Sequence, residues 1–350
     1  MKFKKIRYLA LILTLVFTIT SCNLSISLGN DDSSSTIANM NGPDDSYTVD
    51  IPQNPGDYEV MFVCNNGYTF YSKSTDKNLI IKPDNPSKLC ATFLYWCSDI
   101  ECEKEFDFSK TISKDTKLYA KYSIDFPSLT NIISKDLMKA NIRVECEYYN
   151  NTFMGTTTSG TIGSGVIISE DDNYYYCLTN NHVVYKPSNF RYAKYRIEDC
   201  FENEYDGKVL YNDNTYDLAI IRFEKSDEEL LVANLANSKH LPNKNEYVIA
   251  IGNPLGQYNC ITYGKVISSI ADFNPDEETK EQSYVEFDVI KHSTYIDSGS
   301  SGGPLFDTDL NLIGINFASA VNENNDEFLY SYSIPINKIF EFLSNNNFNI

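Results

Sequence analysis

Short apolar runs separated by polar turns follow one another along most of this chain. The segments Tyr58–Val63 and Lys117–Tyr122 alternate as half-buried strands do, and Leu79–Ile81 is interpreted in the same way. Helical spacing is found only in short pieces, such as Asn337–Leu343 near the end of the chain. The pattern predicts several short β-strands along the chain.

Two neighbouring runs lead to a histidine. Ser164–Ile168 is a short β-branched run, and a second apolar run begins at Tyr175 after the turn Asp171–Asn173. The second run ends in a polar turn that carries His182, one of only three histidines in the chain. His182 is therefore predicted to lie just beyond the end of a strand.

An aspartate opens another apolar strand. Asp217 stands directly before Leu218–Phe223, where an unpaired buried carboxylate would be costly. Asp213, four residues earlier in a polar turn, is interpreted as solvated. Asp217 is thus the better candidate to orient a histidine and stabilise its protonated form.

The segment Asp297–Leu305 contains Ser301 followed by Gly-Gly-Pro and preceded two positions earlier by Gly299. Taken alone, it also fits an ordinary surface loop rich in glycine and serine. With His182 as general base and Asp217 behind it, Ser301 becomes a candidate nucleophile for acyl transfer. The amides of Gly299 and Ser301 would then stabilise the oxyanion, and Gly302 would keep the turn accessible.

The chain order His182, Asp217, Ser301 is that of chymotrypsin-like enzymes. Seven blocks between about residues 128 and 350 resemble the HtrA/Deg-type trypsin-like serine proteases. They are Thr179–Val184, Asp217–Ile220, Ile251–Gly256, Tyr263–Ser268, Gly299–Leu305, Leu312–Asn316 and Tyr332–Asn337. The resemblance implies an all-β fold with two antiparallel, chymotrypsin-like β-barrels, with His182 in the first and Ser301 in the second. It also makes Ser128–Lys139 the leading helix.

The sequence departs from the family pattern at two points. Ser300 stands where the family usually has Asn or Asp before the nucleophile, a position outside the triad. No PDZ domain is expected after the last helical segment, although many family members carry one. Some relatives form trimers, so a homo-oligomer is compatible with the resemblance, but no residue pattern here demands one.

The resemblance also implies which residues line the substrate pocket: Tyr295, Gly314 and Asn316. No aspartate lies six residues before Ser301, which argues against a preference for Lys or Arg. The strand Gly314–Phe317 has no histidine, which argues against a glutamate-specific pocket. An apolar side chain of small to medium size is therefore expected. His292 is interpreted as a partly exposed structural histidine, and His240 as a loop residue.

The N-terminus has the features of an export signal. A basic start is followed by the apolar stretch Leu9–Ile19, which is too short to span a bilayer. Ile19–Cys22 resembles the lipobox of bacterial lipoproteins, which implies a signal peptide over residues 1–22 and a lipid anchor at Cys22 on an exported protein. A plain secretory signal is the alternative. Residues 23–46, rich in Ser, Asn and Asp, are predicted to be a flexible linker.

Residues 47–123 are predicted to form a separate small module, and residues 124–350 the protease domain. The run Phe106–Lys121 resembles the end of a Listeria–Bacteroides repeat (internalin-type B repeat), a small β-grasp-like module of bacterial surface proteins. The usual glycine before the tryptophan is Tyr95 here, and the first half of the module matches the repeat poorly. Its role as a spacer, a partner-binding module or a wall contact is left open.

Composition narrows the partners. The formal net charge of −19 disfavours nucleic acid and anionic membrane surfaces as partners of the folded part. Eight cysteines remain beyond Cys22, an even number that permits disulfides without revealing their connectivity. No Cys/His spacing resembles a zinc site and no acidic loop has an EF-hand pattern, so no metal or cofactor is expected.

The sequence therefore predicts a surface-anchored serine endopeptidase that acts on proteins or peptides through His182, Asp217 and Ser301. The alternative belongs to another class: an adhesin or partner-binding lipoprotein whose protease fold is a catalytically silent scaffold. The intact triad and Gly-Gly-Pro argue against that alternative.

Overall fold

A computed structural model describes residues 47–48, 52–65, 69–153, 155–273, 285–322 and 327–349. The predicted signal peptide, its lipidation site Cys22 and the predicted linker lie outside these residues. Within the described ranges, no helix is long and apolar enough to cross a membrane.

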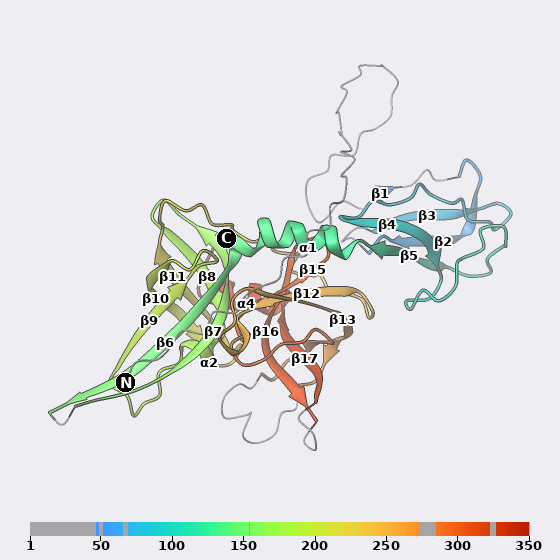
Figure 1. Cartoon of the computed structure of the whole chain (residues 1–350). Coiled ribbons are helices and arrows are strands. Elements are labelled where there is room, and N and C mark those ends of the chain that lie inside the picture. The colour runs from blue at the N-terminus through green and yellow to red at the C-terminus, as the bar shows by residue number, and fades with distance from the viewer. Residues whose placement is uncertain are drawn as a thin grey trace. The chain divides into compact units, whose positions relative to one another are not determined.

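The N-terminal module is a single mixed sheet with strand order β1-β3-β2-β5-β4 (Figure 1). The strands β2 and β5 run parallel at its centre, and β3 and β4 flank them antiparallel, which gives the sheet its β-grasp-like order. The strands are β1 (Tyr47–Thr48), β2 (Pro55–Val63), β3 (Thr69–Thr75), β4 (Ala91–Cys97) and β5 (Thr116–Ile124).

The module has its own small core. Trp96, the single tryptophan, lies on β4, is fully buried and packs edge-on against Phe62 of β2 and Phe70 of β3. The expectation of a strand at Leu79–Ile81 is wrong: this segment is irregular, and it contributes Ile80 to the core without joining the sheet. A disulfide joins Cys97 to Cys102 beside this core.

The leading helix α1 (Phe126–Lys135) is followed by the short 3-10 helix η1 (Leu137–Ala140). Asp125 caps α1 because its side chain accepts the N–H of Ser128, and a proline stands in the first turn where no N–H is needed. Leu129 and Ile133, four residues apart, form the buried face. The helix predicted at Ser128–Lys139 is therefore present as two consecutive pieces.

The first barrel is closed, with strand order β10-β11-β8-β7-β6-β9. The turn between β7 and β8 is the predicted one, and Asp171 stabilises it by accepting the N–H groups of Asn173 and Tyr174. The strands are β6 (Asn141–Thr152), β7 (Gly155–Glu170), β8 (Tyr174–Thr179), β9 (Tyr192–Glu198), β10 (Glu204–Asp213) and β11 (Leu218–Glu224).

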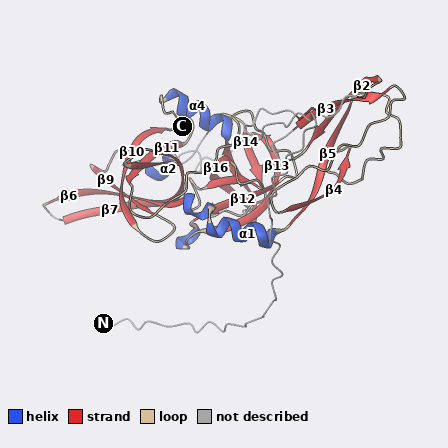
Figure 2. Cartoon of the chain, turned by 90° about the horizontal axis from the view of Figure 1, so that it is seen from above, coloured by secondary structure: helices blue, strands red, loops and turns tan. Residues whose placement is uncertain are grey.

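The second barrel is closed in the order β12-β13-β14-β17-β16-β15, and helix α4 (Ile336–Asn345) follows it. Its strands are β12 (Tyr247–Gly252), β13 (Cys260–Ala271), β14 (Val289–His292), β15 (Pro304–Asp307), β16 (Leu312–Val321) and β17 (Phe328–Pro335). Strands dominate the described chain, and the helices are few and short (Figure 2). The predicted all-β, double-barrel fold class is confirmed.

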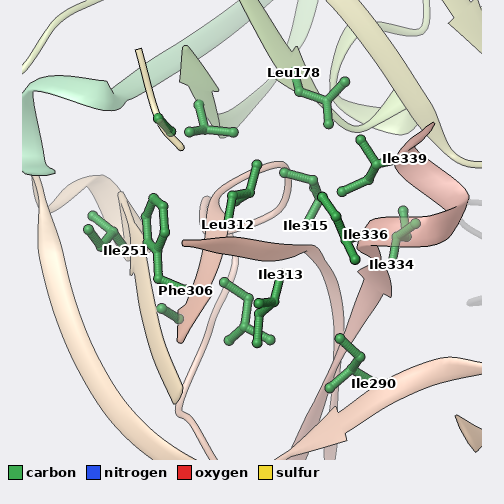
Figure 3. Packing of buried hydrophobic residues seen from close by; sticks show 14 of the residues in the cluster. Leu178, Ile251, Ile290, Phe306, Leu312, Ile313, Ile315, Ile334, Ile336 and Ile339 are labelled. Atoms are coloured by element: carbon green, nitrogen blue, oxygen red, sulfur yellow. The ribbon is translucent and has the colours of Figure 1, made fainter. Parts of the chain in front are cut away.

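One apolar core joins the two barrels. Leu178 of the first barrel packs in the same cluster as Ile315 of β16, in the second barrel, and Ile339 of α4, the helix that follows it (Figure 3). A separate cluster around Ile167, Cys177 and other residues fills the first barrel. Because the shared core contains strands of both barrels, it fixes their mutual orientation and with it the line along which they meet.

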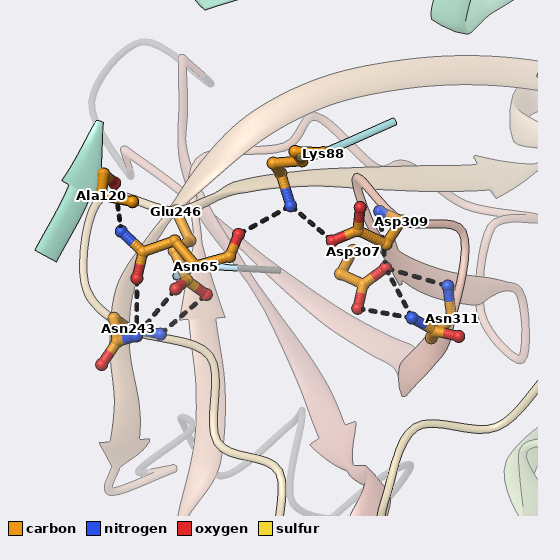
Figure 4. A network of polar contacts seen from close by, with 8 residues as sticks. All are labelled: Asn65, Lys88, Ala120, Asn243, Glu246, Asp307, Asp309 and Asn311. Atoms are coloured by element: carbon orange, nitrogen blue, oxygen red, sulfur yellow. Dashed lines mark hydrogen bonds and ion pairs between the residues drawn. The ribbon is translucent and has the colours of Figure 1, made fainter. Parts of the chain in front are cut away.

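Polar contacts connect loops of the N-terminal module to the second barrel (Figure 4). The ammonium of Lys88 donates to the carbonyl oxygen of Asn65 and to the carboxylate of Asp309, and its side chain is only 7% exposed. Asn243 donates to the Glu246 carboxylate close by. Because Lys88 is buried with a partner on the barrel, this module is in direct contact with the second barrel.

Candidate active site

His182 lies where a strand of the first barrel turns into a single helical turn. Strand β8 ends at Thr179, and α2 (Asn181–Val184) follows at once. Val183 and Val184 pack in the core of the first barrel. The side chain of His182, on the same helical turn, is 21% exposed. The packing of its neighbours therefore holds the imidazole at the barrel edge with one side open.

Asp217 holds the histidine through two contacts. Its Oδ2 lies 2.8 Å from Nδ1 of His182, and its Oδ1 accepts the backbone N–H of His182 at 3.0 Å. The carboxylate side chain is 2% exposed, so these contacts satisfy a buried charge. A carboxylate can only accept, so Nδ1 carries the proton and Nε2 of the neutral ring is left as an acceptor. That is the tautomer a general base requires.

Asp217 itself has a left-handed backbone, with φ of +49°, immediately before β11. Asn180 donates from its side-chain amide to the backbone carbonyl of Asp217 at 2.9 Å. Non-glycine residues in this conformation are uncommon and concentrate at functional sites. The bond from Asn180 thus stabilises the turn that aims the carboxylate at His182.

The loop carrying Ser301 is docked onto the first barrel. Ser164 donates its backbone N–H to the carbonyl of Ser301 at 2.7 Å and its hydroxyl to the carbonyl of Gly299 at 2.7 Å. Gly302 has φ of +84°, and a Cβ there would lie 2.2 Å from the carbonyl oxygen of Ser164. A side chain at Gly163 would meet Val183 and the Ser301 carbonyl oxygen. Close backbone approach therefore brings the serine loop of one barrel against the histidine segment of the other.

The amides around Ser301 are arranged in a consistent way. The carbonyl of Ser298 accepts the N–H of Leu255 at 2.8 Å, so the N–H of Gly299, on the opposite side of the same trans peptide unit, points away from that contact. The N–H groups of Ser300, Gly302 and Gly303 all have carbonyl acceptors. Among the residues that the structure describes, no acceptor contacts the N–H of Gly299 or of Ser301. Two backbone donors flanking a serine hydroxyl are thus available to a ligand oxygen.

The Ser301 hydroxyl donates to the carbonyl oxygen of Phe317 at a long 3.5 Å. The structure describes the side chains of both His182 and Ser301, and no hydrogen bond joins them. Catalytic hydrogen bonds in substrate-free enzymes are commonly long and tighten when substrate binds.

The residues predicted to line the substrate pocket differ in exposure. The Tyr295 side chain is 45% exposed, and its hydroxyl donates to Asp297 at 2.6 Å, which raises the pKa of this phenol. Gly314 and Asn316 are buried in β16. Asn316 uses its side chain inside the barrel, where it donates to the carbonyl of Pro304. The pocket assignment stays a prediction, with Tyr295 as its exposed member.

The expectation that His292 is partly exposed is wrong. Its side chain is fully buried on β14, where it pairs with Ser333, and desolvation lowers its pKa to about 3. His240 lies in a loop, as predicted. In the described part of the chain, no group of three or more His, Cys, Asp or Glu side chains is placed to hold a metal ion.

Two residues that organise the site were not singled out from the sequence. The hydroxyl of Ser164 accepts the backbone N–H of Asn253 at 2.9 Å while it donates to Gly299. Asn253 in turn donates to the carbonyl of Ile142 in the first barrel. The flanking glycines of Ser164 and the Gly-Asn-Pro block around Asn253 were the available signals.

Comparison with family models gives two matches. Residues 163–315 match the trypsin-like peptidase domain, and residues 58–121 match the Listeria–Bacteroides repeat domain. The first match contains His182, Asp217 and Ser301. The predicted resemblances to a trypsin-like protease and to this repeat are therefore confirmed.

Similar curated proteins support the same assignment. Serine protease Do-like HtrA of Bacillus subtilis is 34% identical over 183 residues, which cover 52% of this chain and 38% of that protein. A probable periplasmic serine endoprotease DegP-like of Pseudomonas fulva is 36% identical over 50% of this chain and 33% of its own length. Serine protease HTRA1 of Xenopus tropicalis is 34% identical over 52% of this chain and 35% of its own length. The matched region spans only about a third of the length of each of these relatives.

Proposed function

We propose that this protein is a serine endopeptidase that hydrolyses peptide bonds in protein or peptide substrates. The observation that carries the proposal is the contact between the barrels: the His182–Asp217 pair belongs to the first, and Ser164 binds the Ser301 loop of the second against it. The names of the similar proteins, which describe serine proteases, agree with it.

In the proposed mechanism, the Ser301 oxygen attacks the carbonyl carbon of the scissile peptide while its proton passes to Nε2 of His182. Asp217 keeps the proton on Nδ1 and stabilises the imidazolium that forms. The amides of Gly299 and Ser301 donate to the developing oxyanion. His182 then gives its proton to the leaving amine, which departs and leaves an acyl group on Ser301.

Water completes the cycle. It attacks the acyl carbonyl as Nε2 of His182 takes its proton. The tetrahedral intermediate then collapses to the carboxylic product as His182 returns the proton to the departing Ser301 oxygen. Every proton is carried by His182, so the reaction needs no further co-reactant. The pocket that selects the residue before the cut is proposed to involve Tyr295, Gly314 and Asn316 and to accept apolar side chains of small to medium size.

We further propose that the protein is exported and anchored by lipid at Cys22, with residues 23–46 as a linker, 47–123 as the repeat module and 124–350 as the protease domain. The basic and apolar start of the chain and the Cys22 motif support this, as does the periplasmic description of two DegP-like relatives. Mass spectrometry of the membrane fraction, comparing wild type with Cys22→Ala, tests the anchor. An acylated Cys22 peptide in wild type alone supports it, and an unmodified secreted chain refutes it.

The alternative is an adhesin or partner-binding lipoprotein with a silent protease fold. The repeat module is the feature that favours it, because small surface modules bind partners without catalysis. The deciding experiment is cleavage of unfolded casein by the full chain and by Ser301→Ala. Cleavage that disappears in the variant supports the endopeptidase. Equal residual cleavage by both proteins, or no cleavage by a folded wild-type protein, would favour the silent scaffold.

A further inference from the structure

Behind the serine loop, three polar side chains cross the interior of the second barrel from strand to strand. His292 on β14, Ser333 on β17 and Asn316 on β16 each have no exposed surface. The three strands are hydrogen-bonded neighbours in the order β14-β17-β16. These three residues are called here the buried polar chain.

The direction of each hydrogen bond follows from the donor inventory. Asn316 donates its amide to the carbonyl of Pro304 at 2.9 Å, so its oxygen faces Ser333. The single hydroxyl proton of Ser333 is donated to that oxygen at 2.8 Å. The Ser333 oxygen therefore accepts from Nε2–H of His292, also at 2.8 Å. His292 is the first donor of the chain and is neutral, in agreement with the desolvation that lowers its pKa to about 3.

The other end of the buried polar chain holds the residues that follow the nucleophile. Asn316 accepts the N–H of Gly302 at 2.8 Å and donates its own N–H to the carbonyl of Gly303 at 2.9 Å. Its side chain reaches the carbonyl of Pro304. Asn316 thus fixes the three consecutive residues that follow Ser301. The carbonyl oxygen of Phe317, the residue after Asn316, accepts the Ser301 hydroxyl.

We propose that His292 is a positioning residue: through Ser333 and Asn316 it fixes the loop after Ser301 and thereby the orientation of the Ser301 hydroxyl and amide. The proposal rests on the proposed endopeptidase function. Without the His292 donor, the Ser333 hydroxyl is free to turn, and its hydrogen bond to the Asn316 side-chain oxygen is weakened. Hydrogen bonds in series strengthen one another, so the loss is transmitted along the chain.

The test uses the full chain and four variants: His292→Phe, which removes the donor but keeps a ring; His292→Gln, which keeps an N–H donor; Ser333→Ala; and the double variant His292→Phe/Ser333→Ala. We expect His292→Phe and Ser333→Ala each to lower kcat and the rate of fluorophosphonate labelling about tenfold to a hundredfold, because small displacements of a nucleophile are costly. KM should stay within about threefold, and His292→Gln should recover most of the loss.

The double variant separates a positioning role from general destabilisation. If His292 acts through Ser333, the double variant is no slower than the slower single variant. Ser331→Ala is the matched control, because Ser331 is equally buried on β17 but donates to the carbonyl of Thr294 instead; it should keep the wild-type kcat. Additive losses in the double variant, or a folded His292→Phe with wild-type kcat, overturn the proposal.

A second readout needs no catalysis. Hydrogen exchange at the Gly302 amide, which Asn316 accepts, should speed up by about tenfold in His292→Phe and Ser333→Ala, the order expected for one lost hydrogen bond. If wild type neither cleaves nor labels but this exchange changes, the endopeptidase function fails while the positioning role stands. If wild type is active and exchange at Gly302 is unchanged in both variants, the positioning role fails and the function stands.

Discussion

Two histidines of this molecule each use one ring nitrogen in a hydrogen bond, yet their surroundings suit them to opposite tasks. His182 lies at the edge of the first barrel, partly exposed and 2.8 Å from the buried carboxylate of Asp217. His292 lies inside the second barrel, fully buried and 2.8 Å from the hydroxyl of Ser333. A carboxylate beside an open ring can stabilise an imidazolium, whereas a hydroxyl in an apolar core cannot. The comparison teaches that the partner and the solvent access of a histidine decide whether it can carry a proton.

The largest effect is expected from His182→Ala. Removing the proposed base leaves Ser301 without a proton acceptor, and kcat should fall by about 10⁶-fold, as when triad members are deleted. Hydrolysis of a peptide substrate under saturating conditions measures the loss. If the variant retains more than about a hundredth of the wild-type rate, His182 does not act as the base.

The next largest effect is expected from Asp217→Asn. The amide can donate to the ring where the carboxylate could only accept, so the wrong tautomer of His182 is stabilised and kcat should fall about 10⁴-fold. Thermal unfolding serves as the control for folding of this buried substitution. A folded variant with near-normal kcat would show that the carboxylate does not set the tautomer.

A smaller effect on stability and labelling is expected from Gly163→Ala, next to the helical turn that carries His182. The added Cβ would lie 2.6 Å from the Val183 side chain and 2.8 Å from the Ser301 carbonyl oxygen. Overpacking of this kind costs about 1–3 kcal/mol of stability, and it should also slow labelling of Ser301. Urea unfolding and labelling rates check both expectations; wild-type values for both would mean that the two barrels approach less closely at this point.

The smallest effect concerns pH and His292. The unfolded chain binds a proton at this histidine below pH 6.5, whereas the folded chain does so only below about pH 3. The free energy of unfolding therefore falls as the pH falls through this window. Between pH 7 and pH 5, His292→Gln should lose about 2 kcal/mol less stability than wild type. Urea unfolding at both pH values measures the difference, and parallel losses in the two proteins would contradict a buried, neutral His292.

Sequence patterns were most informative where chemistry and burial conflict. Asp217 stood out because an apolar strand follows it directly, and the structure has it buried against His182. The double-barrel fold followed from a resemblance spread over seven blocks. The catalytic and lipidation roles stay predictions that the experiments above test, and the oxyanion and pocket roles and the domain boundaries stay predictions.

The misses have physical reasons. The burial of His292 depends on β13 and β17, the strands that pair with β14, and a four-residue strand is too short to show a hydrophobic period of its own. Leu79–Ile81 has the composition of a strand but packs Ile80 into the core as a loop. The sequence pattern places Ser164 in a strand but does not reveal its role at the site, because its contacts to Gly299 and Asn253 join segments about 90 residues or more apart.

The central claim, that His182, Asp217 and Ser301 form a working catalytic site, is tested most directly by fluorophosphonate labelling of the full chain followed by peptide mapping. The account predicts one phosphonylated residue, Ser301, and labelling that slows by orders of magnitude in His182→Ala. A folded wild-type protein that is not labelled, or is labelled at a serine other than Ser301, would contradict it.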